Sequence, residues 1–78
     1  MNAVILNEVI NLVCELKGHT LQLSDLTTPA DVEGWDSLFQ ANLITAIETK
    51  YGIRFKLKEI LSWETIGDIV CCIEKHQS

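Results

Sequence analysis

Apolar residues recur with the period of an α-helix in three segments of this chain. In the first segment, residues 2–17, one helix face carries Ile5, Val9, Leu12, Val13 and Leu16. Gly18 follows directly and suits the left-handed backbone position with which many helices end. This spacing predicts a first helix over residues 2–17, with its apolar side covered by the rest of the chain.

The second segment runs from Leu38 to Tyr51, and Gly52 suits its end. At about 100° per residue, one broad face carries Phe39, Leu43, Ala46, Ile47 and Tyr51. The opposite stripe carries Leu38, Asn42, Thr45 and Thr49. Leu38 is therefore expected to be an exposed apolar residue and a candidate for contact with a partner.

The third segment repeats apolar residues at Ile66, Ile69, Val70 and Ile73. Thr65, directly before it, and Asp68, in its first turn, have the spacing of a capping box, which places the start of this helix at Thr65. Residues 57–61 are long enough for about one further helical turn. The chain is thus predicted to be a single all-α domain over residues 1–78, a four-helix bundle with three principal helices and one short helix.

Residues 19–34 have no sustained period and predict a long ordered loop between the first two helices. A loop of this length is unusual unless its leucines fold back onto the helices or it serves a function. Trp35 and Trp63 are interpreted as loop anchors that pack on the core.

Charge and cysteine content exclude several functional classes. The net charge of −5 argues against nucleic-acid and anionic-membrane partners, which bind through clustered cations. Cys14, Cys71 and Cys72 are an odd number without Cys-x-x-Cys spacing, so neither a disulfide framework nor a zinc site is expected, and Cys71 and Cys72 are expected to be buried. His19 and His76 are not expected to bind a metal, since neither is interpreted as having ligand spacing to another histidine or to a cysteine. No signal peptide or membrane span is predicted, and a cytoplasmic location is expected.

The segment Gly34-Trp35-Asp36-Ser37-Leu38 opens the second helix and places Ser37 at its first turn. A hydroxyl at this position points outward, where unpaired N–H groups and the positive end of the helix dipole favour an anionic group such as phosphate. A plainer alternative is that Ser37 and Gln40 form a capping box, which would contribute about 1 kcal/mol to stability.

The same segment resembles the attachment motif of the acyl carrier protein family. The following Ala41-Asn42-Leu43-Ile44-Thr45-Ala46-Ile47-Glu48 and Tyr51-Gly52-Ile53 resemble that family's second helix. The resemblance covers nearly the whole chain, including the long first loop and the short third helix. It implies that Ser37 receives a 4′-phosphopantetheine arm from coenzyme A, whose thiol holds an acyl group as a thioester, and that the carrier itself catalyses nothing.

The resemblance also implies roles for other residues. Contacts with partner enzymes are expected at Asp36, Leu38, Ala41 and Glu48. An acyl chain is expected to rest beside Leu43, Ile44, Ile47 and Ile60. The partners implied are a phosphopantetheinyl transferase and acyl-loading or acyl-processing enzymes such as ketosynthases or adenylating ligases, and the carrier is expected to be a monomer.

The second helix departs from the fatty-acid-synthase pattern, in which this helix is rich in acidic residues. Here it carries Gln40, Asn42, Thr49 and Lys50 and keeps Glu48. This composition weakens charge-steered docking and favours a specialised carrier.

Two other functions stay open at this point: a helical interaction module that is never modified, and a small serine hydrolase with Ser37 as nucleophile and His19 or His76 as base.

Overall fold

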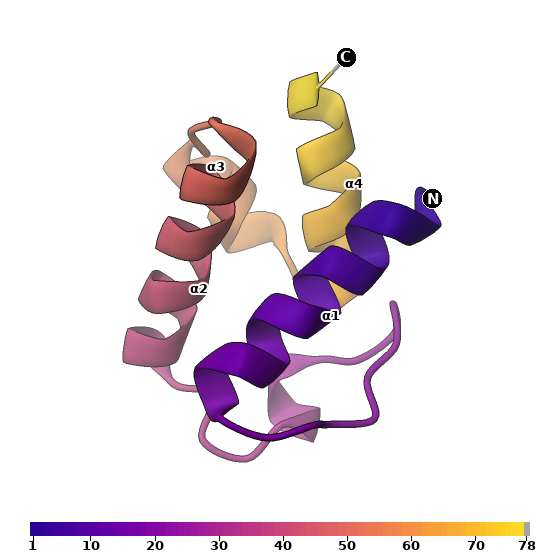
Figure 1. Cartoon of the computed structure of the whole chain (residues 1–78). Coiled ribbons are helices and arrows are strands. Elements are labelled where there is room, and N and C mark those ends of the chain that lie inside the picture. Colours follow the sequence, from indigo (N-terminus) through magenta and orange to yellow (C-terminus); the bar gives the residue numbers. More distant parts are fainter. Residues whose placement is uncertain (78) are drawn as a thin grey trace.

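The computed structural model describes residues 1–77, which form four α-helices and one 3₁₀ turn (Figure 1). The described residues contain no strand. The elements in chain order are α1 (Ala3–Lys17), η1 (Pro29–Asp31), α2 (Ser37–Tyr51), α3 (Leu57–Ser62) and α4 (Ile66–Gln77). The predicted all-α fold, with three principal helices and one short one, is confirmed.

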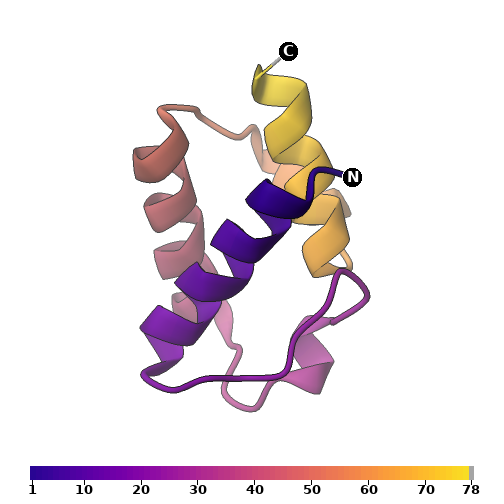
Figure 2. The same cartoon turned by 45° about the vertical axis from the view of Figure 1, so that its right-hand side comes forward.

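Helix α1 packs against both α2 and α4 (Figures 1 and 2). The buried core comes from the apolar faces that the sequence predicts for these three helices. It comprises Ile5, Val9, Val13, Phe39, Leu43, Ile47, Ile66, Ile69, Val70 and Ile73. Within residues 1–77 no polar or charged residue is buried, so burial of apolar surface dominates the stability of this fold.

The helix ends follow the predicted capping residues. Gly18 and Gly52 end α1 and α2 with φ angles of 82° and 64°, in the left-handed region. At the start of α4, the backbone N–H of Asp68 donates to Thr65 Oγ1 at 3.2 Å, and the N–H of Thr65 donates to Asp68 Oδ2 at 3.1 Å. The capping box predicted at Thr65 is thereby confirmed.

The long loop after α1 folds back onto the bundle. Leu21 and Leu23 pack against the core and Val32 is buried, whereas Leu26 is exposed. The 3₁₀ turn η1 was not predicted from the sequence. It is held by Asp31, whose carboxylate accepts hydrogen bonds from the backbone N–H and the hydroxyl of Thr28, and these bonds lower the pKa of Asp31.

Both tryptophans anchor loops, as predicted. Trp35 and Trp63 are partly buried and pack against the core. The ring of Trp63 meets Phe55 edge to face, with the ring centroids 4.8 Å apart. These contacts fix the turn before α2 and join the connection from α3 to α4, which carries Trp63, to the connection from α2 to α3, which carries Phe55.

Within residues 1–77, no helix combines the length and the apolar character that crossing a bilayer requires.

Tyr51 joins the end of α2 to α1 and gives a measurable prediction. Its hydroxyl donates to Glu8 Oε1 at 2.7 Å. Partial burial and the Glu8 carboxylate raise the pKa of Tyr51 above its ordinary value of 10.0. Since the unfolded chain ionises first, the stability contributed by this tyrosine is present below about pH 10 and is lost as the pH rises further.

Tyr51 is the single tyrosine of the chain, so ultraviolet absorbance of the phenolate reports on it alone. We expect a titration midpoint above 10 in the folded protein and a lower midpoint in Glu8→Gln, which keeps the burial but removes the charge. A native midpoint at the ordinary value would contradict this assignment.

Candidate functional site

The turn before α2 is shaped by Gly34. Its φ angle of 80° lies in the left-handed region, where glycine carries no steric penalty. The Lys17 ammonium, at the end of α1, donates to the carbonyl oxygen of Glu33 at 2.6 Å. A Cβ atom at position 34 would lie 2.7 Å from Lys17 Nζ. The turn is therefore fastened to α1 on one side while it leads into α2 on the other.

Trp35 holds this turn against the first turn of α2. Its ring meets Phe39 edge to face at a centroid distance of 5.0 Å, and its Nε1–H donates to Gln40 Oε1 at 2.7 Å. The side chain of Gln40 thus binds Trp35. The turn and the start of the helix form one packed unit, which fixes the direction of the residues between them.

The N-cap of α2 is Asp36, because its carboxylate accepts the backbone N–H of Phe39 at 2.9 Å. The alternative in which Ser37 caps the helix is therefore wrong. Ser37 is the first residue of α2 and is exposed, and its hydroxyl makes no hydrogen bond with any residue in the described part of the chain. The Ser37 hydroxyl is therefore available for chemical modification, because the fold does not depend on it.

The surroundings of Ser37 suit a phosphate ester. The N–H groups of Ser37 and Leu38 lie in the first turn, where helix geometry provides no acceptor, and the helix dipole is positive there. A phosphate at this position can accept from these N–H groups. Three exposed acids, Asp31, Glu33 and Asp36, precede the serine and make the approach to it negative.

Neither histidine is hydrogen-bonded to Ser37. His76 Nε2 lies 3.0 Å from Glu59 Oε2, and His19 Nδ1 lies 3.2 Å from the carbonyl oxygen of Lys17. A serine hydrolase requires a base within hydrogen-bond reach of its nucleophile. The described residues provide no such pair for Ser37, so the geometry does not favour the hydrolase alternative.

The residues predicted to meet partners are placed differently from one another. Asp36, Leu38 and Ala41 are exposed around Ser37, and Leu38 has 71% of its surface accessible. Glu48 is only partly exposed, and its Oε2 accepts the backbone N–H of Phe55 at 2.9 Å. The Glu48 carboxylate therefore holds the connection between α2 and α3, and its predicted contact with partners stays a prediction.

The residues predicted to border an acyl chain lie in or beside the core. Leu43 and Ile47 are fully buried, whereas Ile44 and Ile60 are partly buried. A cavity between the turn before α2 and the start of α4 has a volume of about 20 Å³, which is room for about one water molecule. Its lining comprises Pro29, Trp35, Gln40, Trp63, Glu64, Thr65, Ile66 and Ile69, and thus none of the four predicted residues. An acyl chain at the predicted place would require the helices to move apart.

One group of side chains was missed by the sequence analysis. Cys72 is buried as predicted, but Cys71 is exposed. Cys72 and His76 lie four residues apart on α4 and meet Glu59 of α3, so the statement that neither histidine has ligand spacing to a cysteine was wrong. The spacing of four was visible in the sequence, whereas the approach of Glu59 depends on the packing of α3 on α4.

Comparison with known families gives a match over residues 7–73 to the family described as "Phosphopantetheine attachment site". The matched region includes the turn at Gly34, Ser37 and all of α2 and α3. Comparison with curated proteins gave no significant match.

Among solved structures, the chain is similar to the solution NMR structure of a holo acyl carrier protein from Geobacter metallireducens. The two share 27% sequence identity and a TM-score of 0.86, over 94% of this chain and 85% of the other. The similarity therefore extends over the helices and the long loop.

Proposed function

Since this chain belongs to the phosphopantetheine attachment family, we propose that Ser37 is the residue that carries its 4′-phosphopantetheine arm. The protein is an acyl carrier protein, a carrier without catalytic activity of its own, and its cofactor is the covalently attached arm. The observation that supports Ser37 is its exposed hydroxyl at the first position of α2, beside an N-cap supplied by a different residue, Asp36.

Attachment at Ser37 forms a phosphate ester and breaks the phosphoanhydride bond of coenzyme A. The Ser37 oxygen bonds to the phosphorus of the arm, the bond from that phosphorus to the adenosine bisphosphate part of coenzyme A breaks, and the serine proton leaves. No described side chain of the carrier lies in hydrogen-bond contact with this hydroxyl. The base and the metal that activate the reaction therefore belong to the transferase.

The arm ends in a thiol that holds an acyl or aminoacyl group as a thioester and presents it to partner enzymes. We propose that a phosphopantetheinyl transferase contacts Asp36, Leu38 and Ala41. Asp36 directly precedes Ser37, and the exposed Leu38 and Ala41 lie in the first two turns of α2. The exposed Leu38 adds apolar contact area to this surface.

We further propose that the carrier serves a specialised pathway, in which ketosynthases or adenylating ligases act on the loaded arm. Helix α2 has a single acidic residue, Glu48, and its carboxylate is engaged with Phe55. Lys50 of the same helix lies 3.6 Å from Glu8 of α1. With few free charges on α2, docking relies on shape and apolar contact more than on electrostatic steering.

We propose that the carrier works as a monomer in the cytoplasm, as a single domain over residues 1–78.

The proposed function is tested by intact mass spectrometry after incubation with coenzyme A, Mg²⁺ and a phosphopantetheinyl transferase. We expect the mass to increase by one arm, and only one, and the increase to require coenzyme A. The loaded protein is then expected to accept an acyl group that hydroxylamine removes, as a thioester requires. An unchanged mass with several transferases would favour the unmodified interaction module.

Asp36 allows its two roles to be separated by substitution. Asp36→Asn keeps a good N-cap but removes the charge, whereas Asp36→Ala removes both. We expect Asp36→Ala to lower the free energy of unfolding by about 1 kcal/mol and Asp36→Asn to lower it by less. Both variants are expected to be loaded several-fold more slowly at the same transferase concentration. Equal loading rates in the wild type and in Asp36→Asn would show that the transferase does not read this charge.

A further inference from the structure

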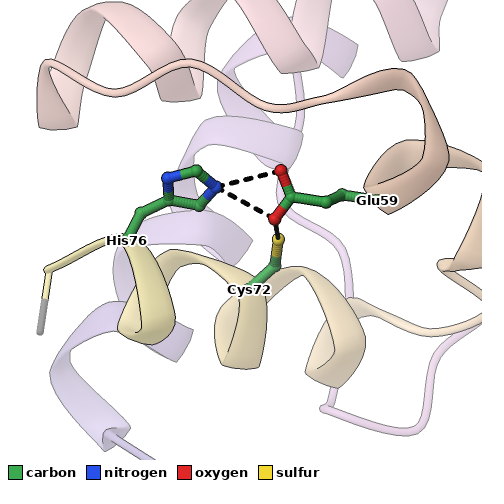
Figure 3. A group of neighbouring side chains, drawn as sticks. All are labelled: Glu59, Cys72 and His76. Carbon is green, nitrogen blue, oxygen red and sulfur yellow. Dashed lines mark hydrogen bonds and ion pairs between the residues drawn. The ribbon is translucent and has the colours of Figure 1, made fainter.

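Three side chains with metal-binding chemistry meet between α3 and α4. None of them comes from α2, the helix that begins at Ser37. Figure 3 shows Cys72 and His76 on one side of α4, both directed at the carboxylate of Glu59 from α3. One potential ligand atom from each lies within 4.8 Å of the other two. Cys72 Sγ is 3.1 Å from Glu59 Oε2, and His76 Nε2 is 3.0 Å from the same oxygen.

We propose that Glu59, Cys72 and His76 form a binding site for a divalent transition-metal ion of the Zn²⁺ class. Around a tetrahedral zinc ion with bonds of 2.0–2.3 Å, neighbouring ligand atoms are roughly 3.3–3.8 Å apart. Two of the observed separations, 3.1 Å and 3.0 Å, are slightly shorter than this range, and the third is at most 4.8 Å. Small side-chain rotations therefore create the site, and a water molecule or an external donor completes the fourth position.

The chemistry of the three donors fits such an ion. Sulfur, imidazole nitrogen and carboxylate oxygen are the donors that zinc takes from proteins. A thiolate, a carboxylate and a neutral imidazole together carry two negative charges, which balance the ion. On binding, the Cys72 thiol proton leaves to solvent, and the sulfur–metal bond replaces the present contact between the thiol and Glu59.

The surroundings prepare Glu59 as a ligand, whereas Cys72 must give up a proton. The backbone N–H of Lys56 donates to Glu59 Oε1 at 2.8 Å, and this bond is the main cause that lowers the pKa of Glu59 to about 2, so the group is a carboxylate at neutral pH. The indole N–H of Trp63 is buried without a hydrogen-bond acceptor among residues 1–77. Burial and the contact with Glu59 raise the pKa of Cys72 to about 11, and Trp63 acts in the opposite direction without offsetting them. The Cys72 thiol therefore keeps its proton in the free protein and loses it only when the metal binds.

Solvent reaches the three residues from two sides. One surface cavity is lined by Cys72, by the acids Glu59, Glu64 and Asp68 and by a single lysine, Lys75, and this excess of acidic residues favours the approach of a cation. A second cavity beside His76 is lined by Lys56, Lys58 and Lys75, whose charges disfavour it. Entry of the ion is therefore expected through the first cavity.

A bound ion would fasten α3 to α4. Helix α3 has only six residues, and none of them is buried. Its contacts with α4 through Glu59 are one thiol hydrogen bond with Cys72 and the contact with His76 Nε2. Metal coordination replaces these with bonds to the same three residues and is expected to slow amide hydrogen exchange in α3 and to raise the melting temperature.

The test is titration of the reduced full-length protein with Co²⁺, a spectroscopic substitute for Zn²⁺. We expect one ion to bind, with visible bands of tetrahedral cobalt and a thiolate-to-cobalt charge-transfer band, and Zn²⁺ to displace it. Cys72→Ser is expected to lose the charge-transfer band, and His76→Gln is expected to weaken binding by at least about tenfold. Circular dichroism checks that each variant is folded.

The matched controls are Cys71→Ser and His19→Gln, which replace exposed residues of the same types outside the cluster. Both are expected to bind Co²⁺ as the wild type does. The same spectrum in Ser37→Ala shows that the thiol of an attached arm is not the ligand, so the result is independent of the proposed function. Loss of the band in Cys71→Ser, an unchanged band in Cys72→Ser, or no binding by the wild type would overturn the proposal.

Discussion

Replacement of Ser37 by alanine is expected to abolish addition of the phosphopantetheine arm completely while the helical fold remains. The arm requires an oxygen at this position, and alanine provides none. The Ser37 hydroxyl makes no hydrogen bond within residues 1–77, and the N-cap of α2 is Asp36. The free energy of unfolding should therefore change by no more than about 0.5 kcal/mol, as at other exposed sites without special contacts.

The measurements are intact mass after incubation with the transferase and chemical denaturation followed by circular dichroism. Ser24→Ala is the matched control, because Ser24 is also exposed and lies in the loop before α2. It should be loaded as the wild type is. Arm addition to Ser37→Ala, or loss of addition in a folded Ser24→Ala, would place the attachment elsewhere.

Replacement of Ile47 by alanine is expected to have the largest effect on stability. Ile47 has no accessible surface and lies in the core cluster built from α1, α2 and α4. Removing a buried isoleucine to alanine costs about 2–5 kcal/mol, because apolar contacts are lost and a cavity remains. A domain of 78 residues has a free energy of unfolding of roughly 4–12 kcal/mol, so a large share of the total is lost.

Denaturant unfolding measures this loss, and Thr49→Ala on the exposed stripe of the same helix is the control. Thr49→Ala should change the free energy of unfolding by about 0.5 kcal/mol or less. A similar loss in both variants would mean that α2 is not packed through the face that carries Ile47. An Ile47→Ala protein as stable as the wild type would contradict the described core.

The helices and their ends could be predicted because both depend on local chemistry. Apolar spacing marked the core faces, and glycines at positions 18 and 52 marked the ends of α1 and α2. The low number of acidic residues in the second helix was also evident from the sequence, but the structural role of Glu48 was not. The hydrogen bond from the Phe55 N–H to Glu48 depends on the path of the chain after Gly52, and the spacing of apolar residues does not predict that path.

The cap of α2 shows why neighbouring candidates are hard to separate by sequence. Asp36 and Ser37 are both good N-cap residues. The side chain of either one could accept a hydrogen bond from the backbone N–H three residues later. The choice depends on Trp35, which packs on Phe39 and takes the side chain of Gln40 as its hydrogen-bond acceptor. That packing places Asp36 at the cap and leaves Ser37 outside it.

The cluster of Glu59, Cys72 and His76 needed the tertiary structure for the same reason. Two of its members share a face of α4, but Glu59 lies on α3, which comes before α4 in the chain and packs on it (Figure 3). The 3₁₀ turn η1 also escaped prediction, because three residues are too few to carry a period.

The central claim, that the arm is attached to the oxygen of Ser37, is tested most directly by locating the added mass within the loaded protein. Trypsin releases residues 18–50 as one fragment, since no lysine or arginine lies between Lys17 and Lys50. This fragment contains both Ser24 and Ser37, so fragmentation that retains the arm must separate them. We predict the whole added mass on Ser37; an arm found on Ser24, or on any other residue, would contradict the account.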